Sequence, residues 1–407
     1  MNSPAPPAET PKAAPAPGGG VRDRVASVDA YRGLIMLLAM AKVLEFSRLH
    51  EELPKNRLWG FLAYHQTHVP WRGCSLNDLI QPSFSFLVGV AVSLSIARRT
   101  TDNQYPWQRT LQALRRALIL VLLGVFLRSL GANQTRWIFT DTLSQLGLGY
   151  GFLYLLALRS ARAQWAALAA ILVGYWLLFA LYPLPGAEFD WAGAGTSPEQ
   201  MLPGFAAHWS LNTNAAWAFD TWFLNLFPPR HAFTNSSGGY ATLSFLPTLG
   251  TMILGLIAGD VLLRDREPLD KVNWLAAVGL AGIAAGWLSD ISGLCPIVKR
   301  IWTPSWVLFS GGWSFLFLAG FYLVMDVWKR RSWAFGLTVI GTNSLAAYLI
   351  AQLFVDFIAT ALPRHLGRRW FSFAGGAYQQ MFLGAAVVLV EWLLLFWLYR
   401  RKIFLRI

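Results

Sequence analysis

The chain's most constraining feature is a series of long apolar runs. A helix that crosses a bilayer needs about 20 mostly apolar residues, and ten segments of the 407-residue chain meet or approach that length. Apolar residues make up 55% of the chain and charged residues 14%, against about 25% charged in an ordinary soluble domain. The sequence therefore predicts an all-α integral membrane protein with about ten transmembrane helices. The expected spans are residues 30–47, 76–97, 116–131, 140–158, 164–183, 240–263, 272–289, 305–328, 333–354 and 380–399.

The basic residues set the expected orientation. With the N-terminus in the cytosol, 20 of the 34 Lys and Arg fall in cytosolic segments, and 12 fall in the outer segments, which hold nearly twice as many residues. Because Lys and Arg accumulate on the cytosolic side of membrane proteins, we expect both termini to be cytosolic. The net charge of +13 then reflects topology. No nucleic-acid-binding motif accompanies the basic clusters, so we expect no nucleic-acid partner.

The chain divides into a tail and one membrane domain. Residues 1–21 are rich in Pro, Ala and Gly and too poor in apolar side chains to order themselves, so a disordered tail is expected. Residues 22–407 form the predicted membrane domain, in which residues 184–239 make a long extracytosolic loop. A loop of this length is usually functional, and we expect it to cap the outer mouth of the bundle. Cys74 and Cys295 fit no metal-ligand spacing, so no metal is expected.

Charged residues inside the expected spans are candidates for function, because burying a charge in a bilayer is costly. Asp29 and Arg32 stand three positions apart and can pair on one helix face. Lys42 could extend to the interface or line a cavity. Glu391 could be a protonated carboxyl bonded to a neighbouring helix or a functional group. The residues by themselves leave these alternatives open.

Residues 65–84 form the segment richest in polar side chains at the start of a span. An imidazole at a helix mouth can act as a general base, because its unperturbed pKa lies near neutrality. His68 is one candidate, and a carboxylate such as Asp78 could orient the ring and stabilise its charged form. The alternative is a polar loop at the membrane interface without a catalytic role.

Two motifs in this region resemble those of a known family. Ser27–Gly33 reads Ser-Val-Asp-Ala-Tyr-Arg-Gly, and His68–Pro82 reads His-x-x-Trp-x-Gly, four residues, and Asp-Leu-x-x-Pro. Both resemble the patterns of the transmembrane acyltransferases related to lysosomal heparan-α-glucosaminide N-acetyltransferase and its bacterial relatives. Weaker similarity follows at Gly341–Ser344 and Leu398–Phe404. The resemblance extends from about residue 22 to the C-terminus.

The resemblance implies a function and a set of site residues. The family binds acetyl-CoA from the cytosolic side and acetylates an amino sugar on the opposite side, and His68 occupies the position of its catalytic histidine. Asp78 is assigned as the orienting carboxylate. Guanidinium groups hold phosphate well, so we assign three arginines near the expected cytosolic face to acetyl-CoA binding. We also assign to it the asparagine of the similar segment Gly341–Ser344. These four residues are Arg24, Arg32, Arg116 and Asn343.

The chain also departs from the family pattern. The family's asparagine late in the first span aligns with Val43, beside Lys42. A histidine aligns with Ala351, and an acidic motif aligns with Gly238-Gly239-Tyr240. Heparan sulfate is therefore not carried over as the acceptor. The expected acceptor is an amino or hydroxyl group of an extracytosolic sugar or glycan.

The prediction is thus a multi-pass acetyltransferase of a bacterial inner membrane, with acetyl-CoA as co-substrate. Its expected partners are acetyl-CoA, a glycan acceptor and membrane lipid, while formation of a homo-oligomer is left open. One alternative is a transporter of a polar solute whose Arg32, Lys42 and Glu391 line a polar path. Another is an inactive relative that serves as a membrane scaffold.

Overall fold

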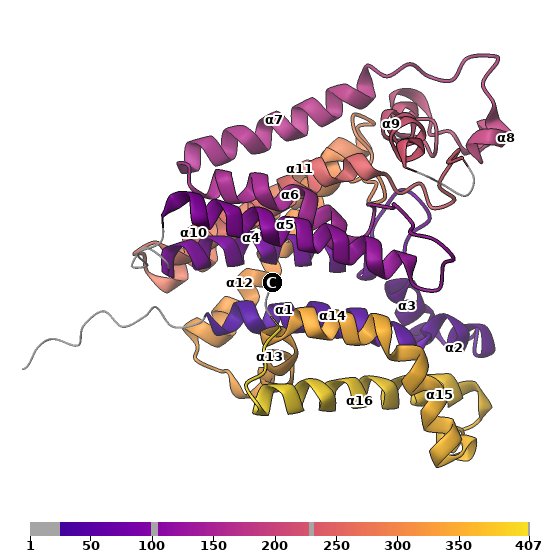
Figure 1. The fold of residues 1–407 in the computed structure, drawn as a ribbon, viewed down its shortest axis with the longest axis vertical. Coiled ribbons are helices and arrows are strands. Elements are labelled where there is room, and N and C mark those ends of the chain that lie inside the picture. The colour runs from indigo at the N-terminus through magenta and orange to yellow at the C-terminus, as the bar shows by residue number, and fades with distance from the viewer. Residues whose placement is uncertain (1–24, 99–104, 228–231, 406–407) are drawn as a thin grey trace, which may run out of the picture.

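The structure is a computed structural model that describes residues 25–98, 105–227 and 232–405. Long helices run side by side through the molecule, and several short ones gather at one end (Figure 1). Among the described residues, pairing of extended backbone is limited to one antiparallel bridge between Arg72 and Val298. The predicted disordered tail, residues 1–21, lies outside the described residues. The long helices are α1 (Ala26–Met40), α4 (Ile80–Arg98), α5 (Pro106–Ser129), α6 (Thr142–Ala157), α7 (Ala161–Ala180), α10 (Phe245–Leu263), α11 (Pro268–Ile291), α12 (Pro304–Tyr322) and α16 (Gln379–Arg400).

The protein is a multi-pass integral membrane protein by the length and hydropathy of its helices. In the part of the chain that the structure describes, seven helical segments qualify as membrane spans, and an eighth is formed if one bent pair counts as a single span. The prediction of about ten spans is not confirmed. The difference arises at α1 and α6, which have 15 and 16 residues and are shorter than the roughly 20 residues that a bilayer requires.

The bent pair consists of α13 (Phe335–Thr342) and α14 (Ser344–Leu353), whose axes differ by 70°. The sequence predicts one continuous span over residues 333–354. The break falls at Asn343, whose backbone leaves the helical region of φ and ψ. Its side-chain amide donates to the carbonyl of Ile403 and accepts from the N–H of Leu405. The helix break is therefore stabilised by the C-terminal segment, which lies far away in sequence.

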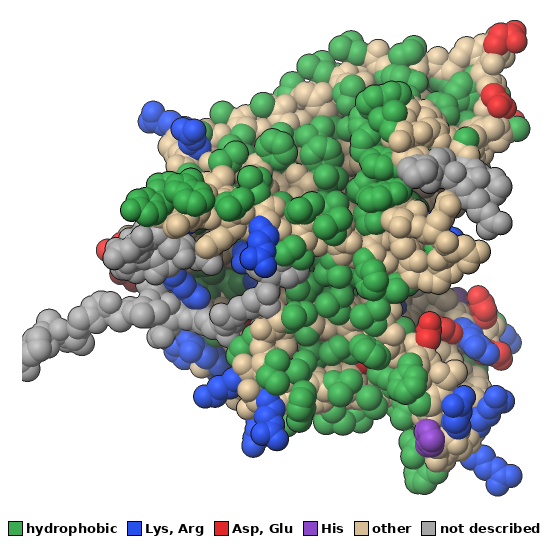
Figure 2. Space-filling view, in the orientation of Figure 1, with side chains coloured by type: hydrophobic (Ala, Val, Ile, Leu, Met, Phe, Trp, Pro, Cys, Tyr) green, Lys and Arg blue, Asp and Glu red, His purple; other side chains and the backbone are tan. Residues whose placement is uncertain are grey.

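The apolar helices differ in how much of their surface faces other helices. In an 18-residue apolar stretch of the α10 span 83% of the residues are buried, whereas the corresponding share is 17% for α5 and for α11. On the face that Figure 2 shows, apolar side chains cover the middle, and most charged side chains lie toward the left and right sides. An apolar surface of this kind suits contact with lipid tails. α10 is thus the core helix, and α5 and α11 are peripheral.

α4 packs along α10 with close contact between the two backbones. A Cβ atom added at Gly255 of α10 would collide with the carbonyl of Phe86, and one added at Gly89 of α4 would collide with the carbonyl of Met252. Small residues of this kind allow close approach of membrane helices. The contact fixes α4, whose first turn directly follows Asp78 and Leu79, against the most buried helix of the bundle.

The shorter helices lie at the end of the bundle where α1 ends and α4 begins (Figure 1). In the predicted extracytosolic loop, residues 184–239, the described parts 184–227 and 232–239 fold there around a buried cluster that includes Trp209 and also contains Val298 and Ile301. Trp71 donates from its indole nitrogen to the carbonyl of Trp209. The loop therefore contacts the segment that contains His68. The short helices are α2 (Phe46–Glu52), α3 (Arg57–Gln66), α8 (Trp191–Ala194), α9 (Ala215–Phe223) and α15 (Val355–Leu366).

Candidate active site

His68 lies in an irregular segment between α3 and the start of α4. The carboxylate of Asp78 holds this segment in place. Its Oδ2 accepts from the backbone N–H of Val69 at 3.2 Å and from both the N–H and the hydroxyl of Ser75 at 3.0 Å. The side chain of Asp78 is 1% exposed. Every one of these bonds favours the ionised carboxylate, so the turn that presents His68 is built around a fixed negative charge.

The His68 imidazole pairs with the same carboxylate. Its Nδ1 lies 2.7 Å from Oδ1 of Asp78, and the His68 side chain is 31% exposed. An ionised carboxylate accepts hydrogen bonds only, so Nδ1 carries the proton and donates it to Asp78. The second ring nitrogen, Nε2, then has a lone pair that can accept a proton. The sequence analysis named these two residues as a pair, and the structure brings them together.

Two further side chains reach the imidazole. Nζ of Lys299 lies 3.1 Å from Nδ1 of His68 and 3.3 Å from Oδ1 of Asp78. The amide nitrogen of Asn77 lies 3.2 Å from Nδ1 and 3.4 Å from Nε2. Lys299 is 5% exposed and Asn77 is 4% exposed. The imidazole therefore borders one buried carboxylate, one buried ammonium group and one neutral amide.

The electrostatics of this cluster favour a neutral His68. The hydrogen bond to Asp78 raises the pKa of His68, but burial and the positive charges of Lys299 and Lys42 outweigh it, so its pKa falls below the usual 6.5. Burial lowers the pKa of Lys299 to about 8, against the opposing effect of Asp78. Near neutral pH the site thus contains a neutral imidazole beside a protonated lysine, and a neutral imidazole is the form that can act as a general base.

His65 has a structural role in the same segment. Its Nδ1 accepts from the backbone N–H of Leu76 at 3.2 Å. Cys74 is a free thiol, and burial raises the pKa of Cys74 to about 12. A thiol with so high a pKa is a poor nucleophile at neutral pH. His68 is accordingly the group in this segment with accessible proton-transfer chemistry.

A second polar region lies at the opposite end of α4. Arg32 of α1 and Arg116 of α5 line one cavity of about 240 Å³ between α1, α4, α5, α6 and α14. Its other lining residues are mainly apolar and include Phe84, Leu143 and Leu146. The sequence analysis assigned both arginines to acetyl-CoA binding, and the structure brings them to the same cavity. We call this region the arginine end of the bundle.

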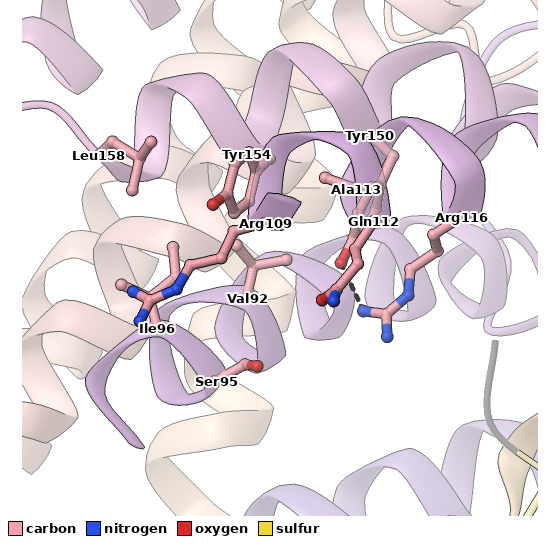
Figure 3. Close-up of a pocket in the computed structure, with 10 residues that line it drawn as sticks. All are labelled: Val92, Ser95, Ile96, Arg109, Gln112, Ala113, Arg116, Tyr150, Tyr154 and Leu158. Atoms are coloured by element: carbon pink, nitrogen blue, oxygen red, sulfur yellow. Dashed lines mark hydrogen bonds between the residues drawn. The ribbon is translucent and has the colours of Figure 1, made fainter. Parts of the chain in front are cut away.

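Figure 3 shows a neighbouring hollow beside α5 and α6. Arg109 and Arg116 project from α5 into this hollow, which Tyr150 and Tyr154 of α6 also line. Nη1 of Arg116 donates to the hydroxyl of Tyr150 at 2.7 Å. Arg109 was not among the sequence-predicted binding residues. Two guanidinium groups and two tyrosine rings in one hollow suit a ligand that contains both phosphate and an aromatic ring.

Of the two remaining predicted binding residues, Asn343 does not line these cavities. Arg24 lies outside the described residues. Asn343 is 2% exposed, and its amide bonds the backbone of the C-terminal segment, although its neighbour Ser344 lines the cavity that contains Arg32 and Arg116. Arg32 also pairs with Asp29 at 3.4 Å, as the three-residue spacing predicts.

α4 joins the two polar regions. Asp78 precedes its first turn, and Ser95, 17 positions further on, lines the cavity that contains Arg32 and Arg116. At 1.5 Å per residue this separation corresponds to about 26 Å, which is close to the thickness of the hydrocarbon part of a bilayer. Phe84 of α4 lines the same cavity, less than two helical turns from Asp78. The cavity thus extends along α4 toward the His68 cluster.

Comparison with known proteins points to one family. No family model matches the chain. The chain is 23% identical over 430 residues to the human protein named heparan-alpha-glucosaminide N-acetyltransferase, and 21% identical over 431 residues to the mouse protein of that name. These alignments cover 94% and 95% of this chain. The chain is a distant homologue of these N-acetyltransferases.

The homology confirms the resemblance that the motifs predict. The chain spans about 60% of the length of the curated relatives that it matches. The aligned part includes most of the membrane bundle, because it covers more than nine tenths of this chain. The comparison thus supports the fold family, while the roles of individual residues in this homologue depend on its own geometry.

Lys299 is the residue at this homologue's site that sequence reasoning missed. It was counted among the ordinary basic residues of the outer loops, 231 positions away from His68. No local signal distinguishes Lys299 from its neighbour Arg300, whose guanidinium donates to the carbonyl of Gly238 instead. Only the folding of residues 292–303 over the His68 segment brings the lysine to the imidazole.

The other charged residues in the expected spans lie in different surroundings. Lys42 is exposed at the end of α1, and its charge acts on His68 and Asp78. Glu391 of α16 is completely buried, and both of its carboxyl oxygens lack a hydrogen-bond partner among the described residues. Among all residues that the structure describes, no group of three or more His, Cys, Asp or Glu is placed to hold a metal ion.

Proposed function

We propose that this protein is a membrane acetyltransferase that moves an acetyl group from cytosolic acetyl-CoA to an amino or hydroxyl group of an extracytosolic sugar or glycan. One observation carries the proposal: α4 connects an arginine-lined cavity at one end with a histidine–aspartate pair at the other. The distant N-acetyltransferase homologues support the same reaction class.

The arginine end has the chemistry that the nucleotide part of acetyl-CoA requires. Coenzyme A carries a pyrophosphate and a further phosphate on its ribose, and arginine binds phosphate oxygens in a bidentate manner. Arg32, Arg109 and Arg116 line two adjoining hollows there. The long, mostly neutral pantetheine arm would extend along the apolar wall that includes Phe84 and Leu146. This arrangement would direct the thioester toward His68.

The sidedness of the proposal rests on the distribution of charge. The arginine end contains Arg98, Arg264 and Lys271 around a further cavity of about 350 Å³, and these residues belong to segments that the charge count places in the cytosol. The His68 end then faces away from the cytosol. A bacterial inner membrane is the location that we propose.

The proposed chemistry uses His68 as a general base. Nε2 would accept a proton from the acceptor amine or hydroxyl as that group attacks the thioester carbonyl. The new C–N or C–O bond forms, the C–S bond breaks, and the coenzyme A thiolate takes up the proton from His68. Alternatively, the imidazole itself could receive the acetyl group and pass it on. Both routes need the neutral imidazole that the cluster favours.

A transporter or an inactive scaffold gains no comparable support. A transport path through Arg32, Lys42 and Glu391 would require the three side chains to share one cavity. Arg32 lines the cavity at the arginine end, whereas Lys42 lies near the His68 cluster and Glu391 is buried within α16 packing. The acetyltransferase homology also favours the enzyme.

Acetyl-CoA binding tests the proposed function. A ligand that binds only the folded state raises the midpoint of thermal unfolding. We expect acetyl-CoA to stabilise the purified wild-type protein and its His68→Ala variant equally, and to stabilise Arg116→Gln less. Arg57→Gln is the matched control, because Arg57 is exposed at the start of α3 at the opposite end. Absence of stabilisation at millimolar acetyl-CoA in folded wild-type protein would contradict the proposal.

A further inference from the structure

We propose that Lys299 is a positioning residue that keeps the His68 imidazole neutral, so that Nε2 is free to accept a proton from the acceptor. The inference rests on the proposed function and deepens it. It adds a residue that neither the motifs nor the comparisons single out. It is carried by the two short distances from Nζ of Lys299, 3.1 Å to Nδ1 of His68 and 3.3 Å to Oδ1 of Asp78.

The backbone at Lys299 is held in place by its own loop. The bridge between Arg72 and Val298 ties this loop to the His68 segment, and the N–H of Gly73 donates to the carbonyl of Ile297. The loop then turns at Trp302, whose N–H donates to the carbonyl of Lys299 and whose φ of 51° is left-handed. A residue without glycine's freedom in that conformation indicates a tightly determined turn. The backbone is thus fixed both before and after Lys299.

Arg300, the next residue in the loop that contains Lys299, connects this loop with residues 238–240 and with the segment that contains His68. Arg300 donates to the carbonyl of Gly238 at 2.7 Å, and its guanidinium lies over the ring of Tyr240 at 5.3 Å. Arg300 also lies 3.5 Å from the carbonyl of Val69, the residue after His68. The two adjacent basic residues therefore differ in their contacts. Arg300 contacts the backbone of two other segments, and Lys299 contacts the His68 imidazole and the Asp78 carboxylate.

Lys299 changes the balance between the two charge states of His68. Oδ1 of Asp78 faces both the imidazole and the ammonium group, so the carboxylate already has one positive partner. Protonation of His68 would place a second positive charge about 3 Å from the first, in a site largely removed from water, where like charges repel strongly. The charged groups that act on His68 are Asp78, Lys299 and Lys42. Asp78 alone favours the imidazolium, and the two lysines oppose it.

A purely structural lysine would behave differently. If Lys299 acted only on the Asp78 turn and its charge did not reach the imidazole, its replacement would lower stability without moving the titration of a folded His68. A positioning residue moves that titration. The titration can be measured without any acetyl transfer, because diethyl pyrocarbonate acylates the neutral imidazole and mass spectrometry locates the modified His68.

The experiment follows the rate of His68 acylation against pH in the wild type and four variants. We expect the wild-type midpoint below pH 6.5, and in Lys299→Met about one pH unit higher, as for loss of a neighbouring like charge. Lys299→Arg should restore the wild-type midpoint. Lys299→Gln keeps a donor for Asp78 without the charge, so it should titrate like Lys299→Met. Lys55→Met removes an exposed lysine at the same end and should leave the midpoint unchanged.

The outcomes separate this inference from the proposed function. A wild-type midpoint above pH 7, or equal midpoints in the wild type, Lys299→Met and Lys299→Gln, would overturn the role of Lys299 even in an active acetyltransferase. The wild-type result needs no variant and stands even if Lys299→Met fails to fold. Shifted midpoints in a protein that binds no acetyl-CoA would instead support Lys299 and refute the proposed function alone.

Discussion

The imidazole of His68 has a proton donor site and a proton acceptor site with different surroundings. Nδ1 faces the buried carboxylate of Asp78, whereas Nε2 has the neutral amide of Asn77 at 3.4 Å, in a side chain that is 31% exposed. This asymmetry is the basis for assigning His68 as the base. It also separates His68 from the other histidines, such as His50, whose Nδ1 has no hydrogen-bond partner among the described residues.

Replacing His68 tests this assignment. His68→Ala should lower acetyl transfer at least 100-fold, since general-base catalysis contributes about 10² to 10⁴, while acetyl-CoA binding stays intact. The measurement is the rate of acetyl transfer at saturating acetyl-CoA, with the thermal shift as a test of binding. His50→Ala is the control histidine and should retain full activity. Equal activity of His68→Ala and the wild type would refute the assignment.

Asp220 offers a test of stability against pH away from the site. It is 1% exposed; Oδ2 accepts from the N–H of Thr242, and Oδ1 lacks a partner among the described residues. Burial raises the pKa of Asp220 to about 6, partly offset by the hydrogen bond from the backbone N–H of Thr242. The unfolded chain has a lower pKa, so between about pH 4 and 6 the folded state binds more protons. The contribution of Asp220 to stability should therefore fall as pH rises through this window.

Asp220→Asn removes the ionisation and keeps an acceptor for Thr242. We expect the variant to unfold a few degrees above the wild type at pH 8 and to match it more closely near pH 4. Thermal unfolding in detergent at the two pH values gives the comparison. A lower unfolding temperature for the variant at pH 8 would show that the carboxylate is stabilised by a group that this account omits.

At the residue scale, the sequence predicts His68 and Asp78 because they lie ten positions apart in one motif. It also predicts Arg32 and Arg116, because both lie near the expected cytosolic face and guanidinium groups hold phosphate well. It does not predict Lys299, because contact over 231 positions is set by tertiary packing. Asn343 was chosen from a short segment of similarity, and its amide pairs with the C-terminal backbone instead of facing the cavity.

At the scale of elements, the crossing of α4 and α10 determines where the His68 cluster lies. The two helices approach so closely that Gly89 and Gly255 leave no space for a side chain. Any separation of the helices would move the first turn of α4, and with it Asp78. The contact between the most buried helix and the site-bearing helix therefore transmits packing changes to the site.

Gly255→Ala should destabilise the protein, because the added methyl group would collide with the backbone of Phe86. Overpacking of this kind costs about 1 to 3 kcal/mol. Thermal unfolding measures the loss, and acetyl transfer should fall with it. Gly174→Ala is the matched control, since a Cβ at Gly174 of α7 meets no atom within 4 Å. Equal unfolding temperatures for the two variants would contradict the close packing of α4 and α10.

The apolar pattern of the sequence predicts the positions of some helices correctly and of others incorrectly. It locates the helices over residues 161–180, 242–263, 268–291 and 304–327 within a few residues. It fails at residues 333–354, because the break at Asn343 depends on hydrogen bonds to the C-terminal segment. It also merges α1 with the following turn, whereas α1 ends at Met40 and the chain turns at Glu45, with φ of 48°.

At the scale of the whole molecule, the proposal requires the two ends of α4 to face opposite sides of the membrane. Single cysteines at positions 55 and 402, in a chain with Cys74 and Cys295 replaced by Ser, report these two sides. An impermeant maleimide should label position 55 in intact bacterial cells and position 402 only after the membrane is opened. The reverse pattern would invert the topology and place the arginine end outside the cytosol.

The whole account depends most on one measurement, which is acetyl transfer by the purified protein in lipid vesicles. The vesicles would be supplied with labelled acetyl-CoA on the side of the arginine end and with glucosamine as the probe acceptor on the other side. We predict labelled N-acetylglucosamine on the acceptor side with the wild type, and at least 100-fold less with His68→Ala. Equal product with both proteins, or no transfer to glucosamine or to glycan acceptors by folded wild-type protein that binds acetyl-CoA, would contradict the account.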